Sequence, residues 1–239
     1  MEDYRGRKFR FENKYMITLA QIELLKCHIE ELCSLDTYSD AANGYNIRSV
    51  YFDDYANNSY RDNEIGSEPR NKFRIRIYNH DASKIYLEEK IKVGGKITKD
   101  RAIVDRAFCD AVLKDEADNL EYPTESPVLN RFLLAYQTKL LRPRIIVEYD
   151  RSAYVYSDGD VRITFDTNIA FSDEVEAFFE KDIFLQPIMP LQKELLEVKY
   201  TEFIPDFIHE ALNIKQLQQN TFSKYYLCQK YKRSGGYEL

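Results

Sequence analysis

The segment FRIRIYNHDASKIYLEEKIK, from Phe73 to Lys92, alternates charged and apolar residues in both of its halves. Successive side chains of a β-strand point to opposite faces of the sheet, so Arg74 and Arg76 share one face and the apolar residues share the other. The polar residues 79–83 fit the turn of a hairpin. The second half places three more charged residues on one face, namely Glu88, Lys90 and Lys92. The segment predicts a hairpin with a basic face, although an ordinary solvated sheet would show the same alternation.

The length and composition of the chain indicate what kind of protein contains this hairpin. The chain has 239 residues, of which 44% are hydrophobic and 14% aromatic, as in a folded globular protein. Nineteen Tyr and fourteen Phe favour β structure. We expect a single domain over residues 1–239, because a barrel of this size can use the whole chain. The formal net charge of −6 argues against a generally basic nucleic-acid-binding surface.

The sequence also indicates a compartment. The four Cys are scattered and form no C-x-x-C motif, which favours free thiols in a reducing environment. The N-terminus has no signal-peptide pattern, and no apolar run approaches the ~20 residues of a membrane span. We therefore expect a soluble, cytoplasmic protein without a membrane span.

Further strands and helices follow from the same patterns. Six more alternating segments predict strands, at Phe9–Tyr15, Ile47–Asp53, Ile97–Val104, Arg144–Tyr156, Val161–Ala170 and Leu191–Tyr200. Caps and apolar spacing predict helices from Thr18 to about Leu35, over Asp105–Leu120, from Ser126, over Pro205–Leu212 and over Lys215–Lys232. Residues 55–69 read as a long loop. About eight strands with interspersed helices predict one α+β, barrel-like domain.

The charged residues are segregated onto one face of these strands. Strand alternation, or a position beside the strands, is expected to place twelve basic residues there: Arg10, Lys14, Arg74, Arg76, Lys90, Lys92, Lys99, Arg101, Arg151, Arg162, Lys199 and Lys224. Four acidic residues accompany them: Glu12, Glu88, Asp166 and Glu197. Two like charges about 6 Å apart repel by roughly 3 kcal/mol at an effective dielectric of 20. If the sheet closes, this repulsion would exceed a domain's net stability of ~5–15 kcal/mol unless an anion offsets it. The pattern therefore favours a tunnel that holds a polyanion over an open sheet with a solvated charged side.

Phosphate is the anion that fits these side chains, because Arg forks match phosphate oxygens in pairs and Lys adds point charge. The sequence contains neither a Walker loop nor G-x-G-x-x-G, which excludes those two phosphate sites. Divalent cations such as magnesium or manganese take carboxylate and phosphate oxygens together. Glu197 is thus a candidate metal ligand, although a lone strand Glu serves equally as an ion-pair partner.

The motifs FENKY, YFD, FRIRIY, YLEEKIK, YDRSAY, VRITFDT, LLEVKY and FSKYY follow in this order along the chain. Together they resemble the VTC domain, the catalytic domain of vacuolar transporter chaperone polyphosphate polymerases in the triphosphate tunnel metalloenzyme superfamily. The resemblance implies an eight-stranded antiparallel β barrel with helices packed outside. It implies transfer of the ATP γ-phosphate to inorganic polyphosphate with a divalent metal, manganese preferred, so ATP and polyphosphate or triphosphate are the expected partners.

The resemblance also assigns roles to residues. It implies phosphate-binding catalytic residues at Arg74, Arg76, Lys90, Arg151, Arg162 and Lys224. It implies further substrate contacts at Lys14, Lys92, Lys99, Arg101, Lys199 and Ser223, with either Lys99 or Arg101 supplying the last of them. The metal-associated carboxylate is implied to be Glu197.

One motif departs from the related CYTH enzymes, which begin with E-x-E-x-K. Here the first Glu is replaced by Arg10, followed by Glu12 and Lys14. One carboxylate fewer disfavours a hydrolase that activates water and favours a polymerase. Two alternatives stay open: a tripolyphosphatase or nucleoside triphosphatase of the same fold, and a non-catalytic polyphosphate or nucleotide sensor.

Overall fold

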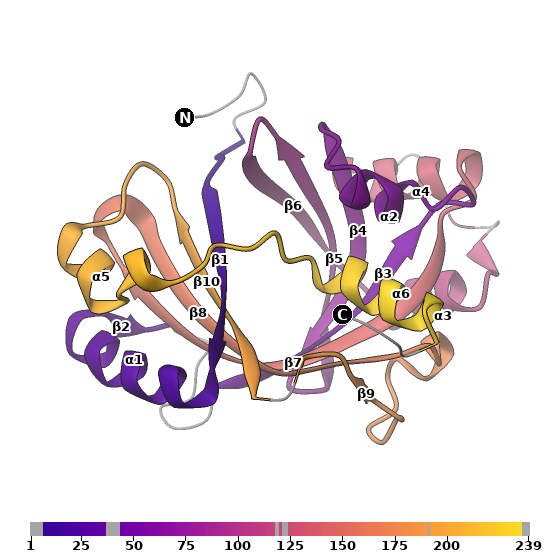
Figure 1. The fold of residues 1–239 in the computed structure, drawn as a ribbon. Coiled ribbons are helices and arrows are strands. Elements are labelled where there is room, and N and C mark those ends of the chain that lie inside the picture. Colours follow the sequence, from indigo (N-terminus) through magenta and orange to yellow (C-terminus); the bar gives the residue numbers. More distant parts are fainter. Residues whose placement is uncertain (1–6, 37–43, 118–119, 121–123, 191, 236–239) are drawn as a thin grey trace.

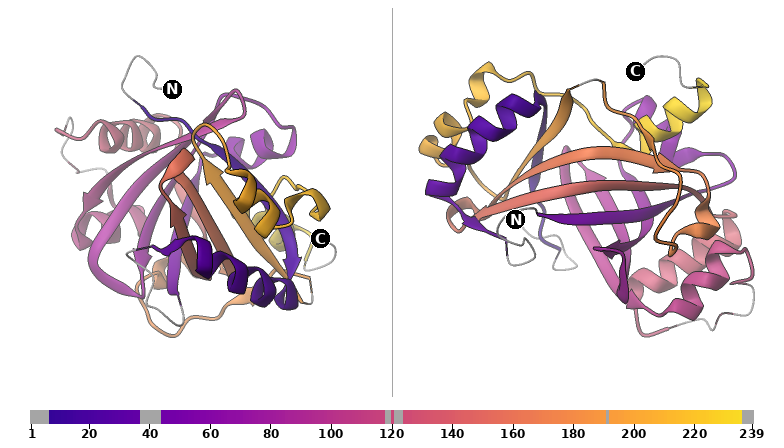
Figure 2. Two further views of the ribbon diagram at one scale, coloured as in Figure 1. Left: turned by 90° about the vertical axis from the view of Figure 1, so that its left-hand side faces the viewer. Right: turned by 90° about the horizontal axis from the view of Figure 1, so that it is seen from below.

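The computed structural model describes residues 7–36, 44–117, 120, 124–190 and 192–235. Its strands form one antiparallel sheet in the order β1-β10-β8-β7-β3-β4-β5-β6, with two short strands beside this path, β2 on β7 and β9 on β8. The strands are β1 (Phe11–Thr18), β2 (Ser34–Leu35), β3 (Tyr45–Asp53), β4 (Arg70–Tyr78), β5 (Asp81–Val93), β6 (Lys96–Val104), β7 (Arg142–Tyr156), β8 (Val161–Ser172), β9 (Gln186–Pro187) and β10 (Lys193–Tyr200). The sheet curls strongly, as Figure 2 shows. The antiparallel, barrel-like α+β fold is confirmed.

The two edge strands of the curled sheet meet at a seam. Arg10, just before β1, exchanges two backbone hydrogen bonds of 3.0 and 2.9 Å with Ile97 of β6. Farther along β1, Tyr15 forms a bridge with Gln219, and the Asn220 N–H donates to the Lys14 carbonyl at 2.8 Å. We call residues 217–223 the strap, because they run across β1 toward the last helix (Figure 1). The seam is therefore built from both ends of the chain.

Four helices cover the outer face of the sheet. They are α1 (Leu19–Leu32), α3 (Arg106–Leu113), α4 (Pro127–Thr138) and α5 (Asp206–Ala211). The apolar residues of α3 and α4 pack on β3 to β6, around Phe132, which is fully buried. Those of α1 and α5 pack on β1, β7, β8 and β10. These two clusters take up the apolar half of each alternating strand, which leaves the charged half on the inner face.

A further apolar cluster fills one end of the inner face. It packs side chains of β3 and β7 against α6 (Lys224–Arg233), and it includes Tyr51, Tyr149 and Tyr225. Tyr51 and Tyr225 stack with ring centroids 5.5 Å apart. Helix α6 therefore differs from the four outer helices, because it brings its first residues to the inner face.

Three element predictions were wrong. Residues 55–69 contain the helix α2 (Asn58–Glu64), whose first turn is held by the Asp53 carboxylate accepting from the backbone N–H groups of Ser59 and Tyr60. The helix expected over Lys215–Lys232 is divided, with a 3₁₀ turn at Ile214–Gln216, the extended strap and then α6, capped by Ser223. The helix expected over Asp105–Leu120 ends at Leu113. Hydrogen bonding between the strap and β1 is tertiary, so the local sequence gave no sign of it.

None of the described helices is both long enough and apolar enough to cross a membrane.

Candidate functional site

Arg74 and Arg76 of β4 project from the inner face beside Glu88 of β5. Arg74 donates to the Glu88 carboxylate at 2.7 Å and to the Tyr51 hydroxyl at 2.9 Å. Arg76 is 4% exposed and lies 3.9 Å from Glu88, and it donates to the hydroxyls of Ser49 and Tyr149. Burial raises the pKa of Glu88, but the three nearby cations Arg74, Arg76 and Lys99 outweigh it and hold the pKa well below its usual value. Both guanidiniums are thus charged and fixed in orientation.

A second group of charges surrounds Asp166 of β8. Arg151 of β7 binds this carboxylate through two parallel hydrogen bonds of 2.6 and 2.7 Å. Lys224, the first residue of α6, reaches the same carboxylate at 2.5 Å and lies over the Tyr149 ring. Burial raises the pKa of Asp166, but Arg151 and Lys224 outweigh it and lower the pKa to about 2. Helix α6 therefore adds a cation to the same wall as the strands.

The third group joins β1, β5 and β10. The Lys14 ammonium lies 2.8 Å from Glu12 and 3.4 Å from Glu197. Lys90 contacts Glu12 at 2.8 Å, and Lys199 contacts Glu197. Burial and the neighbouring Glu197 raise the pKa of Glu12, but the surrounding lysines outweigh both and lower it to about 2. Glu197 is likewise held well below its usual pKa, because Lys199, Lys14 and Arg151 outweigh burial.

These three groups form one interior charge cluster. Its eight cations are Lys14, Arg74, Arg76, Lys90, Lys99, Arg151, Lys199 and Lys224, and its four carboxylates are Glu12, Glu88, Asp166 and Glu197. By formal charge, eight cations and four carboxylates leave an excess of four positive charges, and burial lowers the pKa of Lys199, one of the eight, to about 7. The carboxylates thus offset half of the charge and hold the cations in place, while the excess remains available to an anion.

The other candidate residues lie at the margins of the cluster. Arg162 donates to the Tyr45 hydroxyl at 3.0 Å and pairs with Asp36. Lys92 pairs with Glu68 at 2.9 Å, near the start of β4. Arg101 is exposed and lies over the Tyr86 ring, 5.2 Å from its centroid. Lys99, in contrast, reaches Glu88 at 2.6 Å, so of the two residues left open by the sequence it is Lys99 that joins the cluster.

Two kinds of interior residue were missed or left undecided by the sequence. Lys72 shares the inner face with Arg74, and the alternation Lys72-x-Arg74-x-Arg76 would have revealed it had the predicted strand begun one residue before Phe73. Tyr51 and Tyr149 could have packed on either face, and the structure places their hydroxyls on Arg74 and Arg76. Ser223 caps α6, and its hydroxyl accepts from the Tyr226 N–H.

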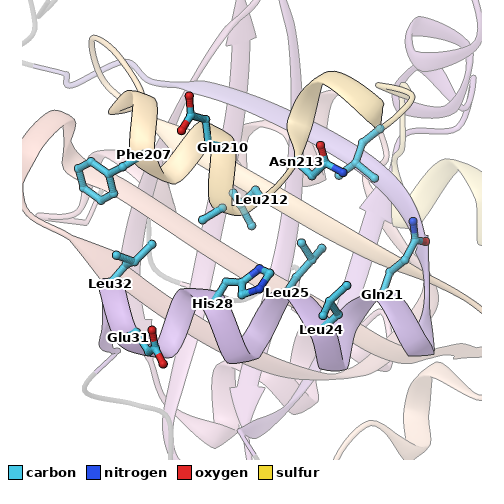
Figure 3. A pocket seen from close by; sticks show the side chains of 12 residues that line it. Gln21, Leu24, Leu25, His28, Glu31, Leu32, Phe207, Glu210, Leu212 and Asn213 are labelled. Carbon is cyan, nitrogen blue, oxygen red and sulfur yellow. The ribbon is translucent and has the colours of Figure 1, made fainter.

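A cavity of about 590 Å³ lies away from this cluster, between α1 and α5 (Figure 3). Its lining is mainly apolar, with Leu24, Leu25, Leu32 and Leu212 pointing into it. Such a groove lacks the cations that an anionic ligand requires. The interior charge cluster is therefore the candidate site.

The lowered pKa of Asp166 predicts how the stability of the fold depends on pH. The pKa of this group is lowered from 3.8 to about 2 on folding, so its ionised form stabilises the fold above pH 3.8, and this contribution is lost as the pH falls through about 2. We expect Asp166→Asn to lower the melting temperature at neutral pH, and the difference from wild type to shrink between pH 4 and pH 2. Thermal unfolding across this range, with the exposed Asp182→Asn as control, measures it. A difference that stays constant with pH would contradict the assignment.

Comparisons with known proteins agree with this fold. A putative adenylyl cyclase from Hippeastrum, described as having a dominant triphosphatase activity, superposes with a TM-score of 0.53 at 14% identity, over 95% of this chain and 96% of that chain. A putative adenylate cyclase from Bacillus halodurans gives 0.53 at 12% identity, over 95% and 98%. At these identities the similarity establishes the fold alone. No curated protein matched the sequence.

The family comparison covers the elements that carry the cluster. The model of the VTC domain matches residues 9–232, which include every cation and carboxylate described above, from Glu12 on β1 to Lys224 on α6. The match extends over far more than half of the 239 residues. The chain therefore belongs to the VTC domain family.

Proposed function

We propose that the protein is a polyphosphate polymerase, which transfers the γ-phosphate of ATP to a growing polyphosphate chain with the help of a divalent cation. The observation that carries this proposal is the interior charge cluster, where eight cations surround four carboxylates inside a curled wall. A linear phosphate chain brings a row of anionic oxygens to such a wall. Membership of the VTC domain family supports the same activity.

The strands supply most of what phosphoryl transfer needs. Its transition state is loose, so positioning and charge stabilisation account for most of the rate. Arg74 and Arg76 would hold the transferring phosphate through their forks, which Tyr51, Ser49 and Tyr149 already orient. Arg151 and Lys224 hold Asp166 next to Tyr149, whose hydroxyl Arg76 also contacts. An incoming phosphate would thus meet cations that are already in position, so these side chains would need to move little on binding.

The carboxylates of the cluster also fit a divalent cation. Glu12 and Glu197 are both ionised, and both lie against the Lys14 ammonium, so two hard oxygen donors face one small volume. Within the described residues no group of three or more acidic, His or Cys side chains forms a complete protein shell. Magnesium and manganese commonly use one or two carboxylates together with substrate phosphates, which matches this donor set. Glu197 and Glu12 would hold the ion, which supplies charge neutralisation at the phosphate oxygens when bound.

A product assay tests the proposal. The purified protein is incubated with ATP and manganese, and the products are sized on a gel. Polyphosphate chains are the expected product. Orthophosphate without chains would support the triphosphatase alternative, which the Hippeastrum neighbour with its triphosphatase activity favours. Tight phosphate binding without turnover under any divalent metal would support the sensor alternative.

The proposed role of Glu197 as a metal ligand can be tested separately. We expect Glu197→Gln to lower the rate of phosphoryl transfer about 100-fold and to weaken its dependence on metal concentration, because a neutral amide is a poor ligand for a hard cation. The measurement is the initial rate as a function of manganese concentration. Glu23→Gln, on the exposed face of α1, is the matched control. An unchanged metal dependence in Glu197→Gln would exclude this carboxylate as a ligand.

A further inference from the structure

Three lysines lie side by side across β4, β5 and β6. Lys72 is the cross-strand partner of Lys90, and Lys90 is the cross-strand partner of Lys99. Directly opposed residues share one face with Cβ atoms about 5 Å apart, where like charges are destabilising. We call these residues the lysine row. It lies two residues along β4 from Arg74, which is about 7 Å.

The members of the lysine row differ in their counter-charges. Lys90 contacts Glu12 and Lys99 contacts Glu88. The contacts of Lys72 are neutral: its ammonium donates to the Asn63 side chain at 3.0 Å and to the Ser223 hydroxyl at 3.1 Å, and it lies 5.4 Å from the centre of the Tyr225 ring. In the part of the chain that the structure describes, no carboxylate forms an ion pair with Lys72. Of the three lysines in the row, Lys72 therefore has the least compensation from the protein's own carboxylates, so a bound anion would stabilise its charge the most.

The surroundings of Lys72 are strongly positive. Burial and the neighbouring cations Arg70, Lys90 and Lys14 lower its pKa to about 7. Asp53 opposes them, but its oxygens already accept from the Tyr60 N–H and the Tyr225 hydroxyl. The first turn of α6 also meets the row, since the hydroxyl that Lys72 contacts is the N-cap of that helix. The positive end of the helix dipole adds to the field of the lysines.

The residue type of the row differs from that of its neighbours along the strand. Arg74 and Arg76 carry planar forks held by tyrosine and serine hydroxyls, which suits one fixed phosphate geometry. A lysine ammonium is a point charge with three donors on a flexible stem, and it accepts a phosphate in many orientations. A row of such groups suits a chain that must shift past the site, whereas the arginines suit the phosphate that is transferred.

We propose that Lys72 extends the interior charge cluster, beside its members Lys90 and Lys99, into a subsite for the part of a polyphosphate chain that lies beyond a bound triphosphate. This proposal rests on the proposed function. Lys72 is then a specificity residue, since it distinguishes a long chain from a short one. A purely structural role, as a link between α2, β4 and α6, would change the affinity for both ligands alike.

Binding of two ligands tests the proposal. Affinities for tripolyphosphate and for long-chain polyphosphate are measured by calorimetry, without nucleotide, on wild type, Lys72→Gln and the exposed control Lys114→Gln. We expect Lys72→Gln to weaken long-chain binding about 10-fold and to leave tripolyphosphate binding within about twofold, as loss of one charge-assisted contact implies. Lys72→Arg, which retains the charge, is expected to retain the preference for the long chain. If Lys72→Gln does not fold, Lys72→Met keeps the side-chain stem over Tyr225 and gives the same comparison.

The remaining outcomes separate a failure of the chain subsite from a failure of the proposed function. Equal weakening of both ligands, or no weakening of either, would overturn the chain subsite and leave the polymerase proposal standing. Wild-type protein that binds neither ligand would overturn the proposed function itself.

Discussion

Replacing Arg76 with alanine is expected to lower the rate of phosphoryl transfer by about 100- to 1,000-fold, the range seen when one preorganised donor to a transition-state oxygen is removed. Arg76 is 4% exposed, and the hydroxyls of Ser49 and Tyr149 fix the plane of its guanidinium. Because the group is oriented before the substrate arrives, its loss removes stabilisation that water cannot replace in a buried site. Initial rates of chain formation from ATP with manganese measure the effect.

Two further variants separate charge from geometry at this position. Arg76→Lys keeps the charge and loses the fork, so we expect it to recover only part of the rate. Arg106→Ala removes an exposed arginine from α3 on the outer face, and we expect it to keep the wild-type rate. Glu88 retains Arg74 and Lys99 in Arg76→Ala, so the fold should persist, which the melting temperature checks. A wild-type rate in Arg76→Ala would remove this residue from the site.

Replacing Arg48 with methionine is expected to destabilise the protein by about 3–5 kcal/mol, the cost of breaking a buried ion pair on one side. Arg48 is 1% exposed and pairs with Glu148. Its guanidinium also donates to the backbone carbonyls of Phe178, Glu180 and Lys181, which ties the segment after β8 to β3. The substitution leaves Glu148 buried without its arginine and leaves three carbonyls without their donor.

The melting temperature measures this loss. For a domain of this size each 1 kcal/mol corresponds to about 2–4 °C, so we expect a decrease of roughly 10 °C. Arg106→Met is the control, because its pair with Asp110 is exposed and such pairs contribute at most about 0.5 kcal/mol. If Arg48→Met has the same melting temperature as the control, Arg48 does not stabilise the packing of the segment after β8 against β3.

The sequence located most of the charged wall, because strand alternation is strict wherever an apolar face is buried. Arg74, Arg76, Lys90 and Arg151 all lie on the inner face for this reason, as does Glu197. Alternation does not say where along a strand the sheet ends. Arg101 shares the face of Lys99, yet it lies over the Tyr86 ring whereas Lys99 reaches Glu88, and Lys92 pairs with Glu68 outside the cluster.

Contacts between segments that are far apart in the chain could not be predicted from local sequence patterns. Arg48 follows the outward alternation of β3, but its carbonyl partners belong to residues more than 120 positions later in the chain. The strap was predicted to be part of a helix over Lys215–Lys232, and only its bonds to β1 reveal the extended form. The four carboxylates were counted correctly, but their role in holding two or more cations each came from the structure alone.

The seam also implies an order of events as the chain folds. Tyr15 and Gln219 lie 204 positions apart, and β1 pairs with β10 across 175 to 189 positions, so these pairings carry the highest loop-closure entropy in the sheet. The hairpins β4–β5, β5–β6 and β7–β8 join neighbours in the chain and can form early. We therefore expect the ring to close last, when β10, the strap and α6 are all available. On a ribosome, the complete basic lining would form only after α6 has emerged.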